Sequence, residues 1–205
     1  MRPLSIVTGT AYPLGLHNVD TDTIIPARWL KTVDREGLAP GAFERLRAQP
    51  DNPFDDPAYL GSSILIAGRN YGCGSSREHA AWATSQIGIR VVIAAGFADI
   101  HEANLLKNGI LPITLPEDQV ELLLARAREG RTITVDLVRK VVEVAPAQSF
   151  SFLVDPFRRE CLLHGLDEID VTLGFASAID RHENRLEVGE PWLSRAAGRV
   201  DRLAG

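Results

Sequence analysis

The sequence predicts an α/β protein in which a mixed β-sheet is flanked by helices. Three observations in residues 60–115 indicate this fold class: short apolar runs, helix-like segments between them, and a glycine where each such segment should end. The apolar runs, typical of buried strands, are Ser63–Ala67, Arg90–Ala95 and Ile110–Leu115. Because strands that alternate with helices usually pair in parallel, we expect some parallel pairing here.

The two segments between these runs carry signals for helix boundaries. Ser75–Ile87 should be a helix, because Ser75 and Glu78 have the S-x-x-E spacing of a capping box and a glycine follows the segment. Ala98–Asn108 should be an amphipathic helix whose polar outer face includes His101. A glycine-rich turn joins the first apolar run to the first of these helices.

The flanking segments are less regular. One short strand is expected in Ser5–Pro13, and Gln49–Pro57, rich in proline and aspartate, is typical of an exposed loop. Further strands are expected at 132–135, 140–144 and 150–154, and further helices at 42–48, 116–129, 155–164 and 170–185. A chain of 205 residues is long enough for one domain, so residues 1–205 should form a single domain with a C-terminal helical tail.

The composition excludes several classes of function. The net charge is −5 and there is no long block of lysine and arginine, which disfavours a nucleic-acid binder. No apolar run approaches the roughly 20 residues needed to span a membrane, and the first residues lack the pattern of a secretory signal. We therefore expect a cytoplasmic protein without a membrane partner.

The cysteines and histidines limit the metal chemistry. The two cysteines, Cys73 and Cys161, lie far apart in the sequence, and the five histidines are scattered. A cubane iron–sulfur cluster normally takes several thiolates. We therefore expect this chain to bind no metal by itself.

The most informative segment is Gly72-Cys73-Gly74-Ser75-Ser76-Arg77. Glycines permit positive φ and close approach of a ligand to the backbone, and unpaired N–H groups at a helix start attract anions. Two hydroxyls and one guanidinium at the same end suit a carboxylate or a phosphate. Serines at a helix start are also ordinary caps, and the spacing alone leaves anion binding and capping equally open.

Four motifs in order extend this interpretation over most of the chain. They are NVDTDTIIPAR at 18–28, GRNYGCGSSREHA at 68–80, GFADIHEANLLKNGILPI at 96–113 and FRRECLLHGLDEI at 157–169. Together, over roughly residues 3–193, the sequence resembles the small subunits of 3-isopropylmalate dehydratase, in the aconitase superfamily. The GxGSSRE stretch is shared more widely with aconitase and homoaconitase.

The resemblance implies a fold, a reaction and a partner. The fold would be the swivelling domain of the aconitase type, with layered β/β/α architecture. The reaction would interconvert 2-isopropylmalate and 3-isopropylmalate by dehydration and rehydration, in leucine biosynthesis. A separate large subunit would carry a [4Fe–4S] cluster, with no cofactor on this chain. Ser75 would be the catalytic base, and Gly74, Ser76 and Arg77 would bind the small dicarboxylate substrate.

By analogy with related small subunits, the segment after Pro26 would select the substrate. It contains Arg28, Trp29, Leu30, Lys31 and Thr32. Trp29 and Leu30 suit a branched apolar group, whereas Lys31 would suit an additional carboxylate. The related acids homoaconitate, 2-methylmalate (citraconate) and dimethylmalate therefore remain alternatives, as does a non-catalytic, anion-binding interaction subunit.

Overall fold

The computed structural model describes residues 1–31, 35–145, 148–189 and 192. The chain forms two compact units, Met1–Leu166 and Asp167–Gly205. The first unit holds both β-sheets and all the described site residues. Among the described residues, none of the helices has both the length and the apolar character that crossing a membrane requires.

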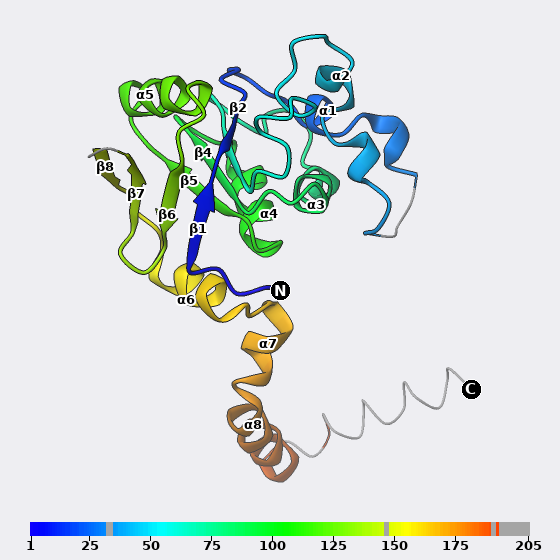
Figure 1. The fold of residues 1–205 in the computed structure, drawn as a ribbon. Helices are drawn as coiled ribbons and strands as arrows, with labels where there is room; N and C mark the ends of the chain where they lie inside the picture. The colour runs from blue at the N-terminus through cyan, green and yellow to red at the C-terminus, as the bar shows by residue number, and fades with distance from the viewer. Residues whose placement is uncertain (32–34, 146–147, 190–191, 193–205) are drawn as a thin grey trace. The chain divides into compact units, whose positions relative to one another are not determined.

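One sheet of the first unit is entirely parallel. Its strands are β2 (Ala11–Pro13), β3 (Ile64–Ile66), β4 (Val91–Ala94) and β5 (Leu111–Thr114), side by side in that order (Figure 1). Its central strands, β3 and β4, are buried throughout, as expected of parallel strands covered on both faces. The three apolar runs of residues 60–115 thus form neighbouring strands.

The second sheet is entirely antiparallel. Its order is β1 (Ile6–Gly9), β6 (Ile133–Asp136), β7 (Val141–Val144) and β8 (Gln148–Ser151). The α/β fold class is as expected, but the expected single mixed sheet is not present, because the parallel and antiparallel pairs lie in two separate sheets. The last strand lies two to three residues earlier than expected, because its pairing with β7 sets its position.

The expectation of a single strand over Ser5–Pro13 is wrong. This segment forms two strands, β1 and β2, which follow one another nearly in line but belong to different sheets (Figure 1). β1 pairs with β6, 124 or more residues further along the chain (Gly9 with Ile133), whereas β2 pairs with β3. Such long-range pairing leaves no signal in the local sequence.

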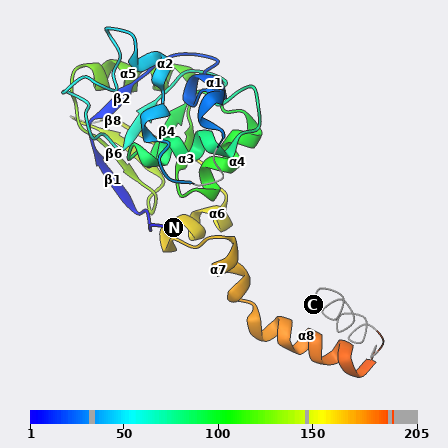
Figure 2. The same ribbon diagram turned by 90° about the vertical axis from the view of Figure 1, so that its right-hand side faces the viewer.

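Helices cover one face of the parallel sheet. The short α1 (Thr21–Ile24) and α2 (Glu44–Arg47) lie with α3 (Glu78–Gln86) and α4 (Asp99–Lys107) on this side. On the opposite side, α5 (Glu117–Arg128) and the antiparallel sheet share a second core with the parallel strands, and α6 (Pro156–His164) contributes to it (Figure 2). The expected layered β/β/α architecture is confirmed.

Alternation along β3 shows how the parallel sheet joins these layers. Ile64 and Ile66 belong to the core shared with the antiparallel sheet, whereas Leu65 between them belongs to the core under the helices. Successive side chains of a strand point to opposite faces, so one short apolar run serves two cores.

Local boundary signals predict some helices closely and others poorly. Asp155 accepts a hydrogen bond from the Arg158 backbone N–H (2.9 Å), and α6 ends at Gly165 with φ +70°, as expected. The expected helix 42–48 is reduced to α2. The helix from Pro116 begins one residue later, since Pro116 is its N-cap.

The second unit departs from the single helix expected at 170–185. It contains α7 (Glu168–Leu173) and α8 (Ala176–Gly189), with Gly174 between them. Asp167 begins α7 through a capping box with Asp170, two residues before the expected start. That residues 1–205 form one domain with a helical tail stays a prediction.

Candidate functional site

A pocket of about 210 Å³ lies where β3 and β4 end. The loop after β3 forms one wall and the loop after β4, with the start of α4, forms the other. Ligands of parallel sheets usually bind at the carboxyl ends of the strands. The lining residues are Gly72, Gly74, Ser75, Ser76 and Arg77 from the first loop and Ala98, Asp99, Ile100 and His101 from the second. The candidate base and the candidate carboxylate-binding residues therefore share one pocket.

The predicted capping box at Ser75 is wrong. α3 begins at Glu78 with Arg77 as its N-cap, and no side chain caps it. The Glu78 carboxylate instead accepts a hydrogen bond from the Asn108 side-chain amide (3.0 Å). Ser75 and Ser76 are exposed in the turn before the helix, so neither hydroxyl serves as its cap.

The turn is held by α1, which comes from the NVDTDTIIPAR motif. The Thr21 hydroxyl donates to the Ser75 carbonyl (3.0 Å), and the Thr21 backbone N–H donates to the Cys73 carbonyl (3.0 Å). One residue earlier in the turn, the Gly72 N–H donates to the Val19 carbonyl (2.7 Å). These bonds fix the backbone that carries the Ser75 side chain.

Arg77 is also held by this motif. Its guanidinium donates to the Asp22 carboxylate (2.5 Å), which orients the positive charge beside the two serines. The sequence does not predict this role of Asp22, because its partner Arg77 lies 55 residues further along the chain.

The start of α4 forms the facing wall. Its N-cap, Ala98, provides no side-chain cap, and the Ala98 backbone N–H donates to the Tyr71 carbonyl (2.9 Å). The expectation that His101 lies on a polar outer face is wrong, because His101 is only 2% exposed. Burial lowers the pKa of His101 to about 4, so the imidazole is neutral at pH 7.

His101 and the glycine turn are in direct contact. A Cβ atom placed on Gly72 would lie 2.1 Å from the His101 Cδ2 atom, and Gly72 has φ +77°. Only glycine therefore fits both the backbone conformation and the space above the imidazole. Of the described residues, none offers a hydrogen-bond partner to either ring nitrogen of His101.

The segment expected to select the substrate lies apart from this lining. Arg28 and the Trp29 indole N–H both bind the Glu44 carboxylate, the latter at 2.9 Å. The hydrogen bond from Trp29, followed by that from Arg28, lowers the pKa of Glu44. Trp29 and Leu30 also pack against the core under the helices.

The remaining residues of that segment are less constrained. Lys31 is exposed, and Thr32 lies outside the described residues. The selecting role of residues 28–32 stays a prediction.

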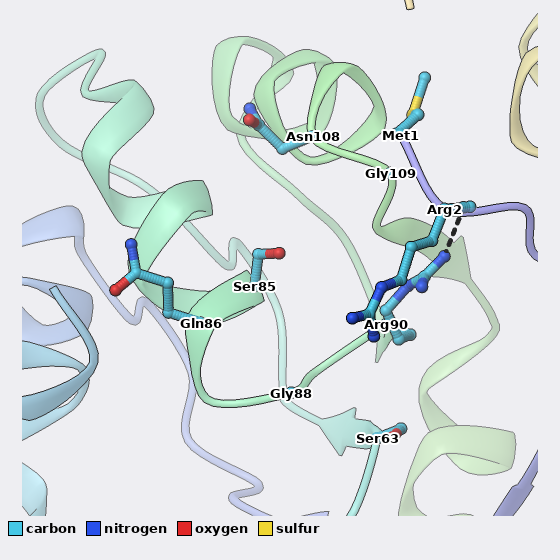
Figure 3. A pocket seen from close by; sticks show the side chains of 9 residues that line it. All are labelled: Met1, Arg2, Ser63, Ser85, Gln86, Gly88, Arg90, Asn108 and Gly109. Carbon is cyan, nitrogen blue, oxygen red and sulfur yellow. Dashed lines mark hydrogen bonds between the residues drawn. The ribbon is translucent and has the colours of Figure 1, made fainter. Parts of the chain in front are cut away.

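A second cavity, of about 630 Å³, lies at the other end of the parallel strands (Figure 3). Arg2 and Arg90 lie side by side in it, and Arg90 donates to the Arg2 carbonyl (2.8 Å). Burial, and then the charge of Arg2, lowers the pKa of Arg90. The carboxyl ends of α3 and α4 border this cavity and favour cations over anions. The helix ends thus explain the two arginines in this cavity without a bound anion.

The described residues contain no group of three or more His, Cys, Asp or Glu side chains that could hold a metal ion. Cys161 is buried in α6, and Cys73 is partly exposed in the glycine turn; both are free thiols. Such a cluster normally takes several thiolates, so the described residues do not fit a [4Fe–4S] cluster. Its expected location on a large subunit stays a prediction.

Comparison with known proteins identifies the family. Residues 1–118, more than half of the chain, match the model of the aconitase C-terminal domain. A 3-isopropylmalate dehydratase small subunit from Zymomonas mobilis is 53% identical over 193 residues, covering 94% of this chain and 100% of the relative. This chain belongs to the family of 3-isopropylmalate dehydratase small subunits.

Two further relatives agree with this assignment. A small subunit from Novosphingobium aromaticivorans is 48% identical and covers 98% of both chains. A crystal structure of 3-isopropylmalate dehydratase from Methanocaldococcus jannaschii has a TM-score of 0.67 at 28% identity, covering 87% of this chain and 99% of that one. The family is one of hydro-lyase subunits in leucine biosynthesis, and the resemblance seen in the four sequence motifs is confirmed.

Proposed function

We propose that this chain joins a separate large subunit to interconvert 2-isopropylmalate and 3-isopropylmalate, and that it works in the cytoplasm. One observation carries the proposal: in a chain of this family, Ser75, Ser76 and Arg77 line one small pocket at the carboxyl ends of the parallel strands. The pocket is small, open to the surface and built on fixed backbone, so it suits one end of a dicarboxylate whose other end a partner binds.

Ser75 would act as the base. In the dehydration step its deprotonated oxygen takes the proton from the carbon next to a carboxylate, the C–H electron pair forms the double bond, and the hydroxyl leaves the neighbouring carbon. Rehydration returns water with the opposite orientation. A base in this position needs an exposed oxygen on a fixed backbone, and Ser75 has both.

The electrostatics of the free chain are insufficient for this role. A serine hydroxyl keeps its proton far above neutral pH, and each unit by which its pKa must fall requires about 1.4 kcal/mol. A helix N-terminus supplies at most about 2 kcal/mol. Asp22 also offsets part of the charge of Arg77. The rest must come from water-excluding contact with the large subunit, which explains why this chain alone should be inactive.

Arg77, Ser76 and the Gly74 backbone would bind the substrate carboxylate. Asp22 engages one terminal nitrogen of Arg77, and since no other described residue binds the guanidinium, its remaining N–H groups can meet a carboxylate. Arg77→Lys should therefore raise KM more than it lowers kcat, because lysine keeps the charge but loses the planar two-pronged contact.

The [4Fe–4S] cluster that the family resemblance assigns to the large subunit would supply a Lewis acid for the departing hydroxyl. This chain contributes the base, the carboxylate contacts and one wall of the closed site. Anaerobic purification of this chain alone should give neither a cluster spectrum nor turnover.

Reconstitution tests the proposal. This chain and a large subunit carrying its cluster are mixed anaerobically, and conversion of 2-isopropylmalate is followed by NMR. Turnover that requires both chains supports the proposal. Turnover by this chain alone would contradict it, as would a reconstituted complex that converts none of the related acids, the outcome expected of a non-catalytic interaction subunit.

Substrate choice is tested with the same complex. If Trp29 and Leu30 form an apolar wall, kcat/KM should be highest for 2-isopropylmalate and lower for 2-methylmalate, because each lost methylene costs about 1–3 kcal/mol. Homoaconitate should be rejected more strongly, since its additional charge would lose water without compensation. A preference for homoaconitate would instead place Lys31 in the selecting role.

A further inference from the structure

His101 is the buried polar side chain of the pocket that the proposed mechanism leaves unused. It lines the pocket with Ser75 and Arg77, yet it is only 2% exposed and neither ring nitrogen has a protein partner among the described residues. Buried side-chain nitrogens are normally hydrogen-bonded, and an unpaired one needs an explanation. A neutral imidazole carries one donor and one acceptor, so both are unpaired here.

Packing alone does not explain a histidine at this position. The ring lies directly beneath Gly72 and is 5.4 Å from the ring of Tyr71, so its surroundings are tight and mostly apolar. An apolar side chain of similar size would fill that space without leaving a donor and an acceptor unpaired. The imidazole therefore destabilises the free chain relative to such a side chain, which points to a partner gained in another state.

The position of His101 indicates the chemistry of that partner. His101 lies in the first turn of α4, where backbone N–H groups without a side-chain cap favour a negatively charged group. Arg77 faces the same pocket with a positive charge, and Asp99 faces it with a negative one. Asp99 offsets part of the positive charge of Arg77. The neutral N–H donor of His101 therefore supplies a further contact to a carboxylate in this pocket.

We propose that His101 is a further substrate-binding residue, whose ring N–H donates to a carboxylate oxygen of the bound dicarboxylate, directly or through one water molecule. The proposal rests on the function proposed above. Both ring nitrogens are sealed in the free chain, so the contact forms when the imidazole rotates from beneath Gly72 towards the pocket, while the hydrogen bonds to Val19 and Thr21 keep the turn in place. Gly72 has no side chain to obstruct that rotation.

Three substitutions separate binding from a structural role. His101→Leu removes both nitrogens, His101→Asn keeps an amide near the position of Nδ1, and His101→Gln keeps one near Nε2. In the reconstituted complex, His101→Leu should keep or raise the melting temperature while KM rises about ten-fold to a hundred-fold, as expected for a lost hydrogen bond to a charged group. Either His101→Asn or His101→Gln should restore KM to within a few-fold. His164→Leu, at an exposed histidine of α6, is the matched control.

Two results would overturn the proposal. One is an unchanged KM in His101→Leu. The other is a KM that follows the loss of melting temperature across all three variants, whether or not an N–H remains, because that pattern belongs to a structural role.

A direct probe separates this proposal from the proposed function. The wild-type complex is assayed first, and a failure to convert 2-isopropylmalate refutes the substrate but leaves His101 to be tested. The imidazole ¹⁵N resonances of His101, assigned with His101→Gln, are then recorded in the complex with and without malate as the probe. A shift to hydrogen-bonded values on adding malate supports the contact, and an unchanged spectrum at saturating malate contradicts it.

Discussion

Acidification should destabilise this protein through His101 at pH values where most of its carboxylates are still ionised. The folded chain keeps His101 neutral with a pKa of about 4, against an ordinary value of 6.5. The unfolded chain binds a proton on His101 near pH 6.5, which the folded chain does not. The folded chain therefore has its full stability above that pH and loses stability as the pH falls towards 4. Each pKa unit corresponds to about 1.4 kcal/mol.

These values give the size of the effect. The free energy of unfolding should fall by about 2 kcal/mol between pH 7 and pH 5, and by about 3 kcal/mol near pH 4. One neighbour acts in the opposite direction: burial, and then the charge of Asp99, raises the pKa of Glu102, so protonation of Glu102 favours the folded chain as the pH falls. Comparing the wild-type chain with His101→Leu removes this contribution, because both proteins retain Asp99 and Glu102.

Urea unfolding at pH 7 and pH 5 measures the difference. The wild-type chain should lose about 2 kcal/mol more than His101→Leu over this range, with equal m-values. The four other histidines are present in both proteins. Equal losses in the two proteins would refute the claim that a neutral, buried His101 sets this pH dependence.

Two further predictions concern the turn that carries the site. Gly72→Ala should lower the free energy of unfolding by about 3 kcal/mol and remove most of the activity, because the new Cβ would need φ +77° and would lie 2.1 Å from the His101 ring. The control Gly130→Ala, at φ +70° with open space, should lower it by only about 1 kcal/mol. Similar melting temperatures for the two variants would contradict this reasoning. Asp22→Asn should lower kcat/KM about ten-fold through misplacement of Arg77, with stability changed by less than 1 kcal/mol; a normal kcat/KM would show that Asp22 does not position the guanidinium.

The sequence predicts those parts of the fold whose signals are local. The strand runs of residues 60–115 and the helix between Asp155 and Gly165 are formed as expected, because each has its own apolar run, cap or terminating glycine. The division of Ser5–Pro13 between two sheets depends on pairing with distant strands. No window of neighbouring residues contains that information.

The site shows the same limit. The serines and arginine of the glycine turn were recognisable from residue types and from the family motif. The start of the following helix was not, because Thr21 and Asp22 hold the turn from a distant segment and override the local capping pattern. The sequence predicts that His101 lies on the polar face of an amphipathic helix, whereas the tertiary structure buries it beneath Gly72.

Ser75→Ala, in the complex reconstituted with the large subunit, tests the central claim most directly. Ser149→Ala, at an exposed position of β8, is the matched control. Because Ser75 is exposed and does not cap α3, its replacement should leave the melting temperature nearly unchanged while turnover of 2-isopropylmalate falls by several orders of magnitude. Ser149→Ala should retain normal turnover. Near-normal turnover by Ser75→Ala at an unchanged melting temperature would contradict the assignment of Ser75 as the base.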